Sequence, residues 1–283
     1  IHPVKAVIGG VTSGVDGAEA AVLREQLVET LPVACELFDY YWDQSVALRG
    51  RIGTWGDDAP AYYLTAIDDH RPNYDGMDSA PLIRVLDPDG ACCETFPVQA
   101  FRDYLTFEET EYSYADRTSY RGDVMRANSL ARMNMTEQFG TSCADRYLER
   151  FREAFGRPAH AILLFDLGRG IELVYALERA IEILDESLDQ GETAVSFTPQ
   201  DGEGYGLVEA PRGPLIHRYR IEDGLIGDAE FIIPTVHNNL AIERALRVAA
   251  RRYITPERVD MELEQAVGRV VRAFDPCIAC ATH

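Results

Sequence analysis

Apolar side chains recur at spacings of three and four between residues 159 and 188. This spacing places them on one face of an α-helix, so the segment is predicted to be a helix buried in a core. Core packing accounts for the whole pattern. The residues concerned are Leu167, Ile171, Val174, Leu177, Ile181, Leu184 and Leu188.

Four further stretches have helical patterns. Asp16 and Glu19 have the spacing of a capping box, which predicts a helix from there towards Gly50 with a kink at Pro32. Thr255 as a cap and Pro256 at the first helical position predict the start of the last helix. The other stretches are 127–155, 239–253 and 257–274.

Strand patterns form two small groups. The turn Asp87 to Gly90 joins the β-prone runs 82–86 and 91–96, which predicts a hairpin. A second β element is expected from 193–198, 204–209 and 214–221, with a hairpin turn at 222–224. The remaining stretches are interpreted as a glycine-rich connector, a long ordered loop with one short strand, and an irregular segment: 1–14, 53–79 and 112–122.

These patterns predict a mainly α fold of the α+β class. We expect one domain over residues 1–283, a helical bundle with small antiparallel β elements at its edge. A chain of 283 residues is long enough to bury a sizeable core without disulfide or metal staples.

The composition excludes some partners. The net charge is −20, from 47 acidic and 27 basic residues, which argues against nucleic acid and anionic membranes as partners. There is no apolar run of eighteen residues and no secretory leader, so a cytoplasmic location is expected, although a chain beginning at Ile1 makes the missing leader weak support. The six cysteines are predicted to be reduced thiols, since no secretion signal precedes them.

The C-terminal segment carries the clearest chemical signal. Cys277 and Cys280 lie three positions apart, and His283 follows three positions later. A C-x-x-C turn aims both sulfurs at one point, and thiolates select soft or borderline metals such as nickel, zinc and iron. A metal site is therefore the first hypothesis, and a pair of reduced surface thiols is the alternative. A chain ending at a candidate ligand suggests a terminus made by processing.

Two thiolates do not complete a metal site. An isolated tetrahedral site needs four ligands, or three and an open position. Other histidines and cysteines are scattered without paired spacing. Either the fold gathers single ligands or a second chain brings another pair, and the residues alone leave both possibilities open.

The terminal sequence DPCIACATH resembles the C-terminal signature of nickel-iron hydrogenase large subunits. Other stretches agree in the same order along nearly the whole chain. They are IHPVKAVIGGV at 1–11, LIRVLDPDG at 82–90, SLARMN at 129–134, GLVEAPRGPLIHRY at 206–219 and IIPTVHNN at 232–239. In look the chain is closest to the cytoplasmic, cofactor-coupled group of that family.

The resemblance implies roles for the terminal ligands. Cys277 is similar to the terminal thiolate on nickel, and Cys280 to the thiolate that bridges nickel to an iron carrying cyanide and carbon monoxide. His283 resembles the ligand of a nearby structural magnesium, and it is the residue after which the family's processing protease cuts.

Three further residues resemble the groups that line the open face of that centre. Arg212 stands where the family places a guanidinium, with Pro211 and Asp275 beside it. An always-charged, fork-shaped arginine can orient a bound diatomic molecule, and a carboxylate beside it balances its charge. His237 and His217 fit packing as well as function, and Ala281 is interpreted as subgroup variation.

The sequence departs from the family in one large respect. The family's N-terminal motif R-x-C-G-x-C, with the glutamates that relay protons and bind magnesium, is absent from these 283 residues. The resemblance therefore implies the C-terminal portion of a large subunit, split or shortened, whose centre is completed by a partner chain that supplies the second cysteine pair.

The implied activity is reversible hydrogen oxidation and proton reduction at a nickel-iron centre. Electrons would leave through an iron-sulfur small subunit, then through further electron-transfer subunits, because this chain has no spare cysteine set for a cluster. The alternative is a non-catalytic subunit whose C-terminal C-x-x-C and histidine hold a structural zinc.

Overall fold

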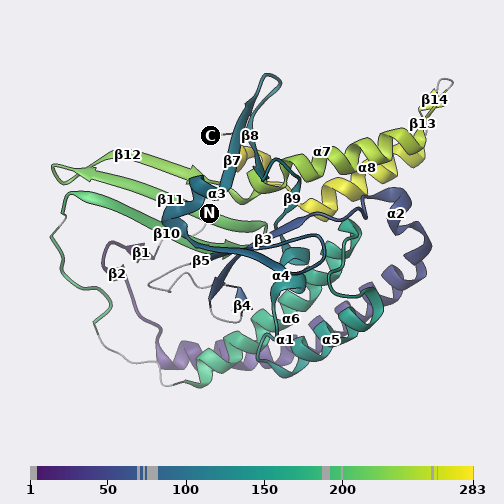
Figure 1. Cartoon of the computed structure of the whole chain (residues 1–283). Helices are drawn as coiled ribbons and strands as arrows, with labels where there is room; N and C mark the ends of the chain where they lie inside the picture. The colour runs from purple at the N-terminus through teal and green to yellow at the C-terminus, as the bar shows by residue number, and fades with distance from the viewer. Residues whose placement is uncertain are drawn as a thin grey trace.

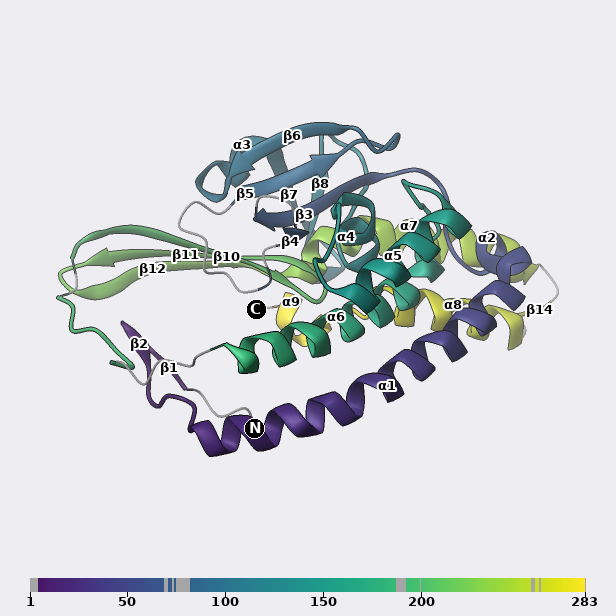
Figure 2. The same cartoon turned by 90° about the horizontal axis from the view of Figure 1, so that it is seen from below.

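A computed structural model gives the fold (Figures 1 and 2). It describes residues 5–68, 71–72, 74, 82–186, 192–198, 200–255, 258–259 and 261–282. The α+β class expected from the sequence is confirmed: long helices form one side of the molecule, and small sheets form the other.

The helical side consists of α1 (Gly17–Ala47), α5 (Ser142–Phe155) and α6 (Phe165–Asp185), which pack side by side (Figure 2). The predicted cap of α1 is confirmed, because the Asp16 carboxylate accepts the backbone N–H groups of Ala18 and Glu19. Where α1 crosses α6, a Cβ at Gly170 would lie 2.9 Å from the Phe38 ring, so only glycine allows this close approach.

The first sheet has the order β4-β3-β5-β6, with β9 parallel to β3 on the opposite side from β5. The hairpin predicted from the turn at Asp87 is confirmed as β5 and β6. The loop expected over 53–79 is wrong for its described part, because that stretch contains the short helix α2 and the seven-residue strand β3 at the centre of the sheet. β3 is buried almost throughout, so it lacks the alternation that marks a half-exposed strand. The strands are β3 (Tyr62–Asp68), β4 (Arg71–Pro72), β5 (Leu82–Leu86), β6 (Cys92–Pro97) and β9 (Met125–Arg126).

Two other β elements extend from this body (Figure 1). β10 (Gly202–Ala210), β11 (Gly213–Glu222) and β12 (Leu225–Ile232) form the expected antiparallel group, but residues 193–198 form no strand and Ala194 makes only an isolated bridge. The irregular segment expected over 112–122 is wrong, because β7 (Leu105–Thr110) and β8 (Ser113–Tyr120) pair as a hairpin.

The predicted helix over 127–155 is two helices. α4 (Ser129–Met135) is buried along its whole length between β3 and α6, and the chain turns at Gly140 before α5. α7 (Pro234–Tyr253) begins five residues earlier than predicted, and α8 (Met261–Phe274) packs against it. Pro256, the predicted first helical residue of the last helix, lies outside the described residues.

The remaining elements are short. They are β1 (Ala6–Val7), β2 (Gly10–Val11), α2 (Ile52–Trp55), α3 (Phe101–Tyr104), β13 (Ile254–Thr255), β14 (Arg258–Val259), α9 (Ile278–Ala281) and 3₁₀ turns at Arg49–Arg51, Val98–Ala100 and Ile162–Leu164. Among the helices of the described residues, none combines the length and the apolar character needed to cross a bilayer.

Candidate metal centre

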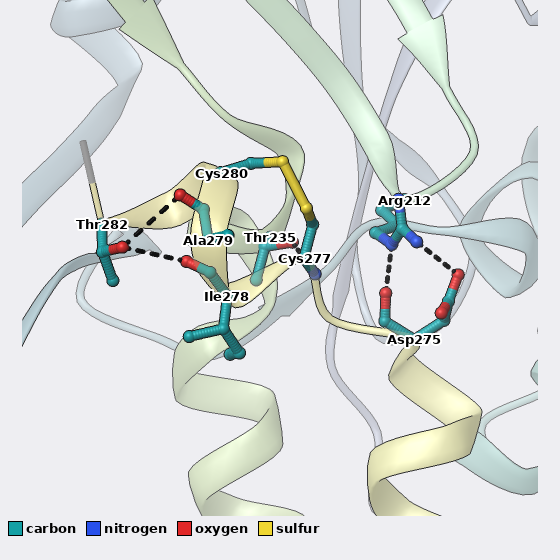
Figure 3. The surroundings of a disulfide bond; sticks show 8 residues. All are labelled: Arg212, Thr235, Asp275, Cys277, Ile278, Ala279, Cys280 and Thr282. Atoms are coloured by element: carbon teal, nitrogen blue, oxygen red, sulfur yellow. Dashed lines mark hydrogen bonds and ion pairs between the residues drawn. A yellow bond between two sulfur atoms is a disulfide. The ribbon is translucent and has the colours of Figure 1, made fainter. Parts of the chain in front are cut away.

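The C-terminal turn brings the two predicted thiol ligands together. Cys277 precedes the single turn α9, and its Cα lies 5.4 Å from that of Cys280. The structure joins their sulfurs as a disulfide (Figure 3), so the prediction of reduced thiols is wrong for this pair. The physical reason is the three-residue spacing, which points both side chains at one place. The other cysteines are free as predicted, at Cys35, Cys92, Cys93 and Cys143.

This end of the chain is not covered by the described residues. Cys277 is half-buried, whereas Cys280 is exposed and the side chain of Ile278 is 59% exposed. The expectation of a buried C-terminus is therefore wrong over residues 277–280, because no described element packs over α9 from the outside. His283, the predicted magnesium ligand, lies outside the described residues.

Arg212 lies beside the cysteines and is held by Asp275 (Figure 3). Its Nη2 is 2.8 Å from the Asp275 carboxylate, and its Nε donates to the Asp275 backbone carbonyl. Asp275 has a φ of +48°, which lets the chain turn sharply at the end of α8. The structure thus brings together the arginine and the carboxylate that the sequence singled out, from the β10–β11 turn and from the end of α8.

Arg132 is a site residue that the sequence reasoning missed. It is fully buried in α4 and forms ion pairs with Glu172, 2.8 Å from Nη2, and with Glu209, 2.7 Å from Nη1. The same guanidinium donates to the carbonyls of Ala210 and Pro211 at 3.2 and 2.9 Å. Arg132 therefore fixes the backbone of the turn that presents Arg212. An arginine inside an otherwise apolar helix pattern was the available signal, because arginine is rarely buried without such partners.

Glu209 links this turn to the first sheet. Its carboxylate pairs with Arg132 and also accepts the backbone N–H of Ala66 in β3 at 2.7 Å. Full burial raises the pKa of Glu209 to about 7, while the charge of Arg132 and the hydrogen bonds favour its ionised form and act in the opposite direction. Burial thus makes the charged form of Glu209 depend on Arg132.

The end of α8 is held by donors from two other elements. Arg169 of α6 donates to the carbonyls of Arg272 and Ala273 at 3.0 and 2.9 Å. Asn128, just before α4, donates to the carbonyl of Phe274 at 2.9 Å. These carbonyls have no partner within the helix, and a cation near them is favoured by the helix dipole. The position of the residues that follow α8 is therefore determined by buried contacts.

Two residues of α7 fix the neighbouring backbone. The Thr235 hydroxyl accepts the backbone N–H of Cys277 at 3.0 Å (Figure 3). The Asn238 amide donates to the Arg212 carbonyl at 3.0 Å and accepts the N–H of Ala127 at 2.9 Å. Both are almost completely buried, so they position Arg212 and Cys277 relative to each other.

The two histidines near the site have structural contacts. His237 is fully buried, and its Nε2 donates to the Pro214 carbonyl at 3.1 Å. His217 is half-buried on β11 against Tyr219 and Phe231. Packing therefore accounts for both side chains, as the sequence allowed.

A cavity of about 620 Å³ lies behind the Pro211 turn. The ion-paired group of Arg132, Glu172 and Glu209 forms its polar end, and one face of α6 forms its apolar wall. The residues of α6 that line it include Leu173, Ala176, Ala180 and Ile183.

The donor set fits half of a thiolate metal centre. When reduced, Cys277 and Cys280 offer two soft ligands at one point, beside a fixed guanidinium. Within the described part of the chain, no three histidine, cysteine, aspartate or glutamate side chains gather closely enough to hold a metal ion. The described fold does not collect single ligands from elsewhere, so the remaining ligands have to come from another part.

Comparison with known proteins decides the family. Residues 72–283 match the family described as nickel-dependent hydrogenase. The chain belongs to this family. The match covers most of the chain, including the Pro211 turn and both cysteines of the C-terminal segment.

Individual hydrogenases are similar over the whole chain. The vhc F420-non-reducing hydrogenase of Methanococcus voltae is 31% identical, and the match covers 100% of this chain and 61% of the relative. The beta subunit of the NAD-reducing hydrogenase HoxS of Cupriavidus necator is 29% identical, with the same two coverages. The chain thus spans about three fifths of the length of these relatives.

Solved structures agree with the fold. An NAD⁺-reducing [NiFe]-hydrogenase in the H2-reduced state superposes with a TM-score of 0.90 at 25% identity, over 100% of this chain and 63% of that chain. A [NiFeSe]-hydrogenase of Dm. baculatum superposes with a TM-score of 0.70 at 20% identity, which shows the fold alone. The hydrogenase large-subunit fold is therefore present along the described residues.

Proposed function

We propose that this chain is the C-terminal portion of the catalytic subunit of a nickel-iron hydrogenase, which oxidises hydrogen reversibly. The observation that carries the proposal is the position of Arg212 and Asp275 beside the converging sulfurs of Cys277 and Cys280 in a member of the nickel-dependent hydrogenase family. The centre, when bound, supplies a Lewis acid and a redox-active site for splitting hydrogen into a proton and a hydride.

This chain's own groups hold and shape that centre. Reduced Cys277 and Cys280 provide two thiolates, and the N–H of Cys277 bonded to Thr235 fixes the first of them. Arg212, held by Asp275, presents a fixed cation beside the sulfurs and orients the diatomic substrate. Pro211 stiffens the turn that presents the guanidinium, and its carbonyl is held by Arg132.

The other ligands come from outside these 283 residues. The second cysteine pair is assigned to the portion that the relatives possess beyond the matched three fifths, as a partner chain or as a continuation of the polypeptide. Cyanide and carbon monoxide on iron, magnesium at His283, and iron-sulfur clusters in a small subunit complete the proposal. The electron acceptor is left open by these residues, and the cytoplasmic location stays a prediction.

Metal analysis and infrared spectroscopy of the purified complex test this function. We expect nickel and iron together with infrared bands of metal-bound carbon monoxide and cyanide. Peptide mass spectrometry of the same sample identifies the polypeptide that carries the second cysteine pair and shows whether it is a separate chain. Stoichiometric zinc without those bands would overturn the proposal in favour of a structural zinc subunit.

A further inference from the structure

Helix α1 carries large apolar side chains on two faces. One face packs against α6 and α5 through buried residues such as Phe38 and Trp42. A helix that covers a core with one face is normally polar over the rest of its surface. The outward side of α1, which borders the molecule in Figure 2, does not follow this rule.

At about 100° per residue, nine positions of α1 fall within an arc of about 100° on its outward side. None of the nine carries a charge, in a chain in which 26% of residues are charged. We call them the outer stripe. They are Val22, Leu23, Gln26, Thr30, Val33, Leu37, Tyr40, Tyr41 and Gln44.

The large apolar members of the outer stripe are open to solvent in this structure. Their exposed fractions lie between 46 and 61%. The six are Val22, Leu23, Val33, Leu37, Tyr40 and Tyr41.

Charged residues of α1 lie beside this arc. Glu25, Glu29, Glu36 and Asp43 fall on an adjoining strip of the same helix, and all four are exposed. The water-facing strip and the uncharged strip are therefore separate. A surface of uncharged amides and apolar side chains that includes tyrosines has the composition of the core of an interface.

The dimensions of the outer stripe limit what can cover it. From Val22 to Gln44 it is about 33 Å long, and one helix is about 10 Å wide, so it offers roughly 300 Å². A stable interface between free proteins buries about 800 Å² on each partner. The occupant must therefore also be held elsewhere on this chain.

We propose that an α-helix of the missing portion of the large subunit, the portion that carries the second cysteine pair, covers the outer stripe. The inference rests on the proposed function, which requires that portion to reach Cys277 and so anchors it at a second place. The hydrogenases that match this chain over its full length have more than a third of their own length outside the match. Apolar residues at spacings of three and four, as in Val33, Leu37 and Tyr40, form the ridges between which a second helix packs.

Hydroxyl-radical footprinting of the assembled complex tests this surface. Tyr40 and Tyr41 are expected to lose most of their labelling relative to the same chain purified alone. Tyr114, which is 93% exposed on the β7–β8 hairpin, is compared as a reference in both samples. Unchanged labelling of Tyr40 and Tyr41 in the assembled complex would overturn the proposal.

Two matched variants of the complex make the test specific. Val33→Asp places a charge on the outer stripe, and Val28→Asp places the same charge about 140° away on α1. Their exposed fractions are 61% and 44%. Val33→Asp is expected to restore labelling of Tyr40 and Tyr41, whereas Val28→Asp leaves their protection intact. Protection that survives Val33→Asp counts against a helix packed there.

The remaining outcomes separate the partners. Cross-linking mass spectrometry identifies which polypeptide contacts α1. A second copy of this chain, or an iron-sulfur subunit, on the outer stripe would overturn the inference while leaving the infrared bands of the proposed function unaffected. If the bands are missing but the cysteine-bearing portion still covers the stripe, the proposed function fails and the interface stands.

Discussion

Arg212 contacts Asp275 twice, through the carboxylate and through the backbone carbonyl. Lysine has a single ammonium group and cannot present the same fork, so Arg212→Lys keeps the charge and loses the geometry. In the assembled hydrogenase we expect turnover to fall about 100-fold, the size of effect seen when one preorganised donor is removed from an active site. Hydrogen-oxidation assays and metal analysis measure the two quantities, and metal content is expected to stay the same.

Arg220→Lys is a matched control, because Arg220 lies on β11 with a half-exposed side chain and one distant carboxylate at 3.5 Å. Its replacement is expected to leave turnover unchanged. Full turnover of the Arg212→Lys enzyme would remove Arg212 from the assigned role. Loss of nickel from that variant would instead give Arg212 a part in assembly.

Burial of His237 makes the stability of the fold sensitive to acid. Burial lowers its pKa from 6.5 to about 4, because the charged imidazolium is poorly solvated inside the protein. Between these pH values the unfolded chain binds a proton that the folded chain does not. The contribution to stability is therefore fully present above about pH 6.5 and is lost as the pH falls towards 4, to a limit of about 3 kcal/mol.

Replacing the imidazole tests this dependence. The His237→Gln amide can still donate to the Pro214 carbonyl but does not titrate. Urea unfolding at pH 7 and pH 5 is expected to show a smaller loss of stability on acidification than in the unaltered protein. His217→Gln provides the comparison, since that imidazole is only partly buried and should have a smaller effect. Equal pH dependence in the unaltered and His237→Gln proteins would contradict the prediction.

At the scale of elements, the β10–β11 turn depends on its contact with the segment before α4. Gly213 has a φ of +128°, and a Cβ there would lie 2.4 Å from the Ala127 Cβ. Gly213→Ala therefore has to strain the backbone and separate the turn from α4. We expect it to lower the free energy of unfolding by about 3 kcal/mol and to displace Arg212.

Gly224→Ala isolates the backbone term. Gly224 has a φ of +73° at the tip of the β11–β12 hairpin, and no atom lies within 4 Å of its ideal Cβ. Its replacement should cost about 1 kcal/mol from backbone strain alone. Urea midpoints of the two variants give the comparison, and a Gly213→Ala protein no less stable than Gly224→Ala would show that the turn can relax away from Ala127.

The elements predicted from sequence are those with local signals. The cap at Asp16 and the turn at Asp87 act over a few residues, and the structure confirms both. β3 and the β7–β8 hairpin were missed, since their strands are recognised by pairing and burial rather than by a repeating local pattern. The break between α4 and α5 was missed because both helices are amphipathic and their patterns nearly continue one another.

At the scale of the whole molecule, the candidate site lies where elements far apart in sequence meet. The end of α8, the β10–β11 turn, α4 and α7 converge near the C-terminal turn (Figures 1 and 3). The exposed Cys280 and the outer stripe of α1 are open surfaces of the same chain. Both are explained if the chain is completed by the rest of a hydrogenase large subunit.

The sequence by itself determined the family and the residues expected at the metal centre, because C-x-x-C spacing and the EAPRG motif are short and chemically specific. It also determined the class of fold, since helical periodicity is a local property. The tertiary structure alone decided that Arg132 holds the Pro211 turn and that Asn238 holds Arg212, because these contacts join residues 79 and 26 positions apart. Such contacts depend on how separate elements pack, which no local pattern records.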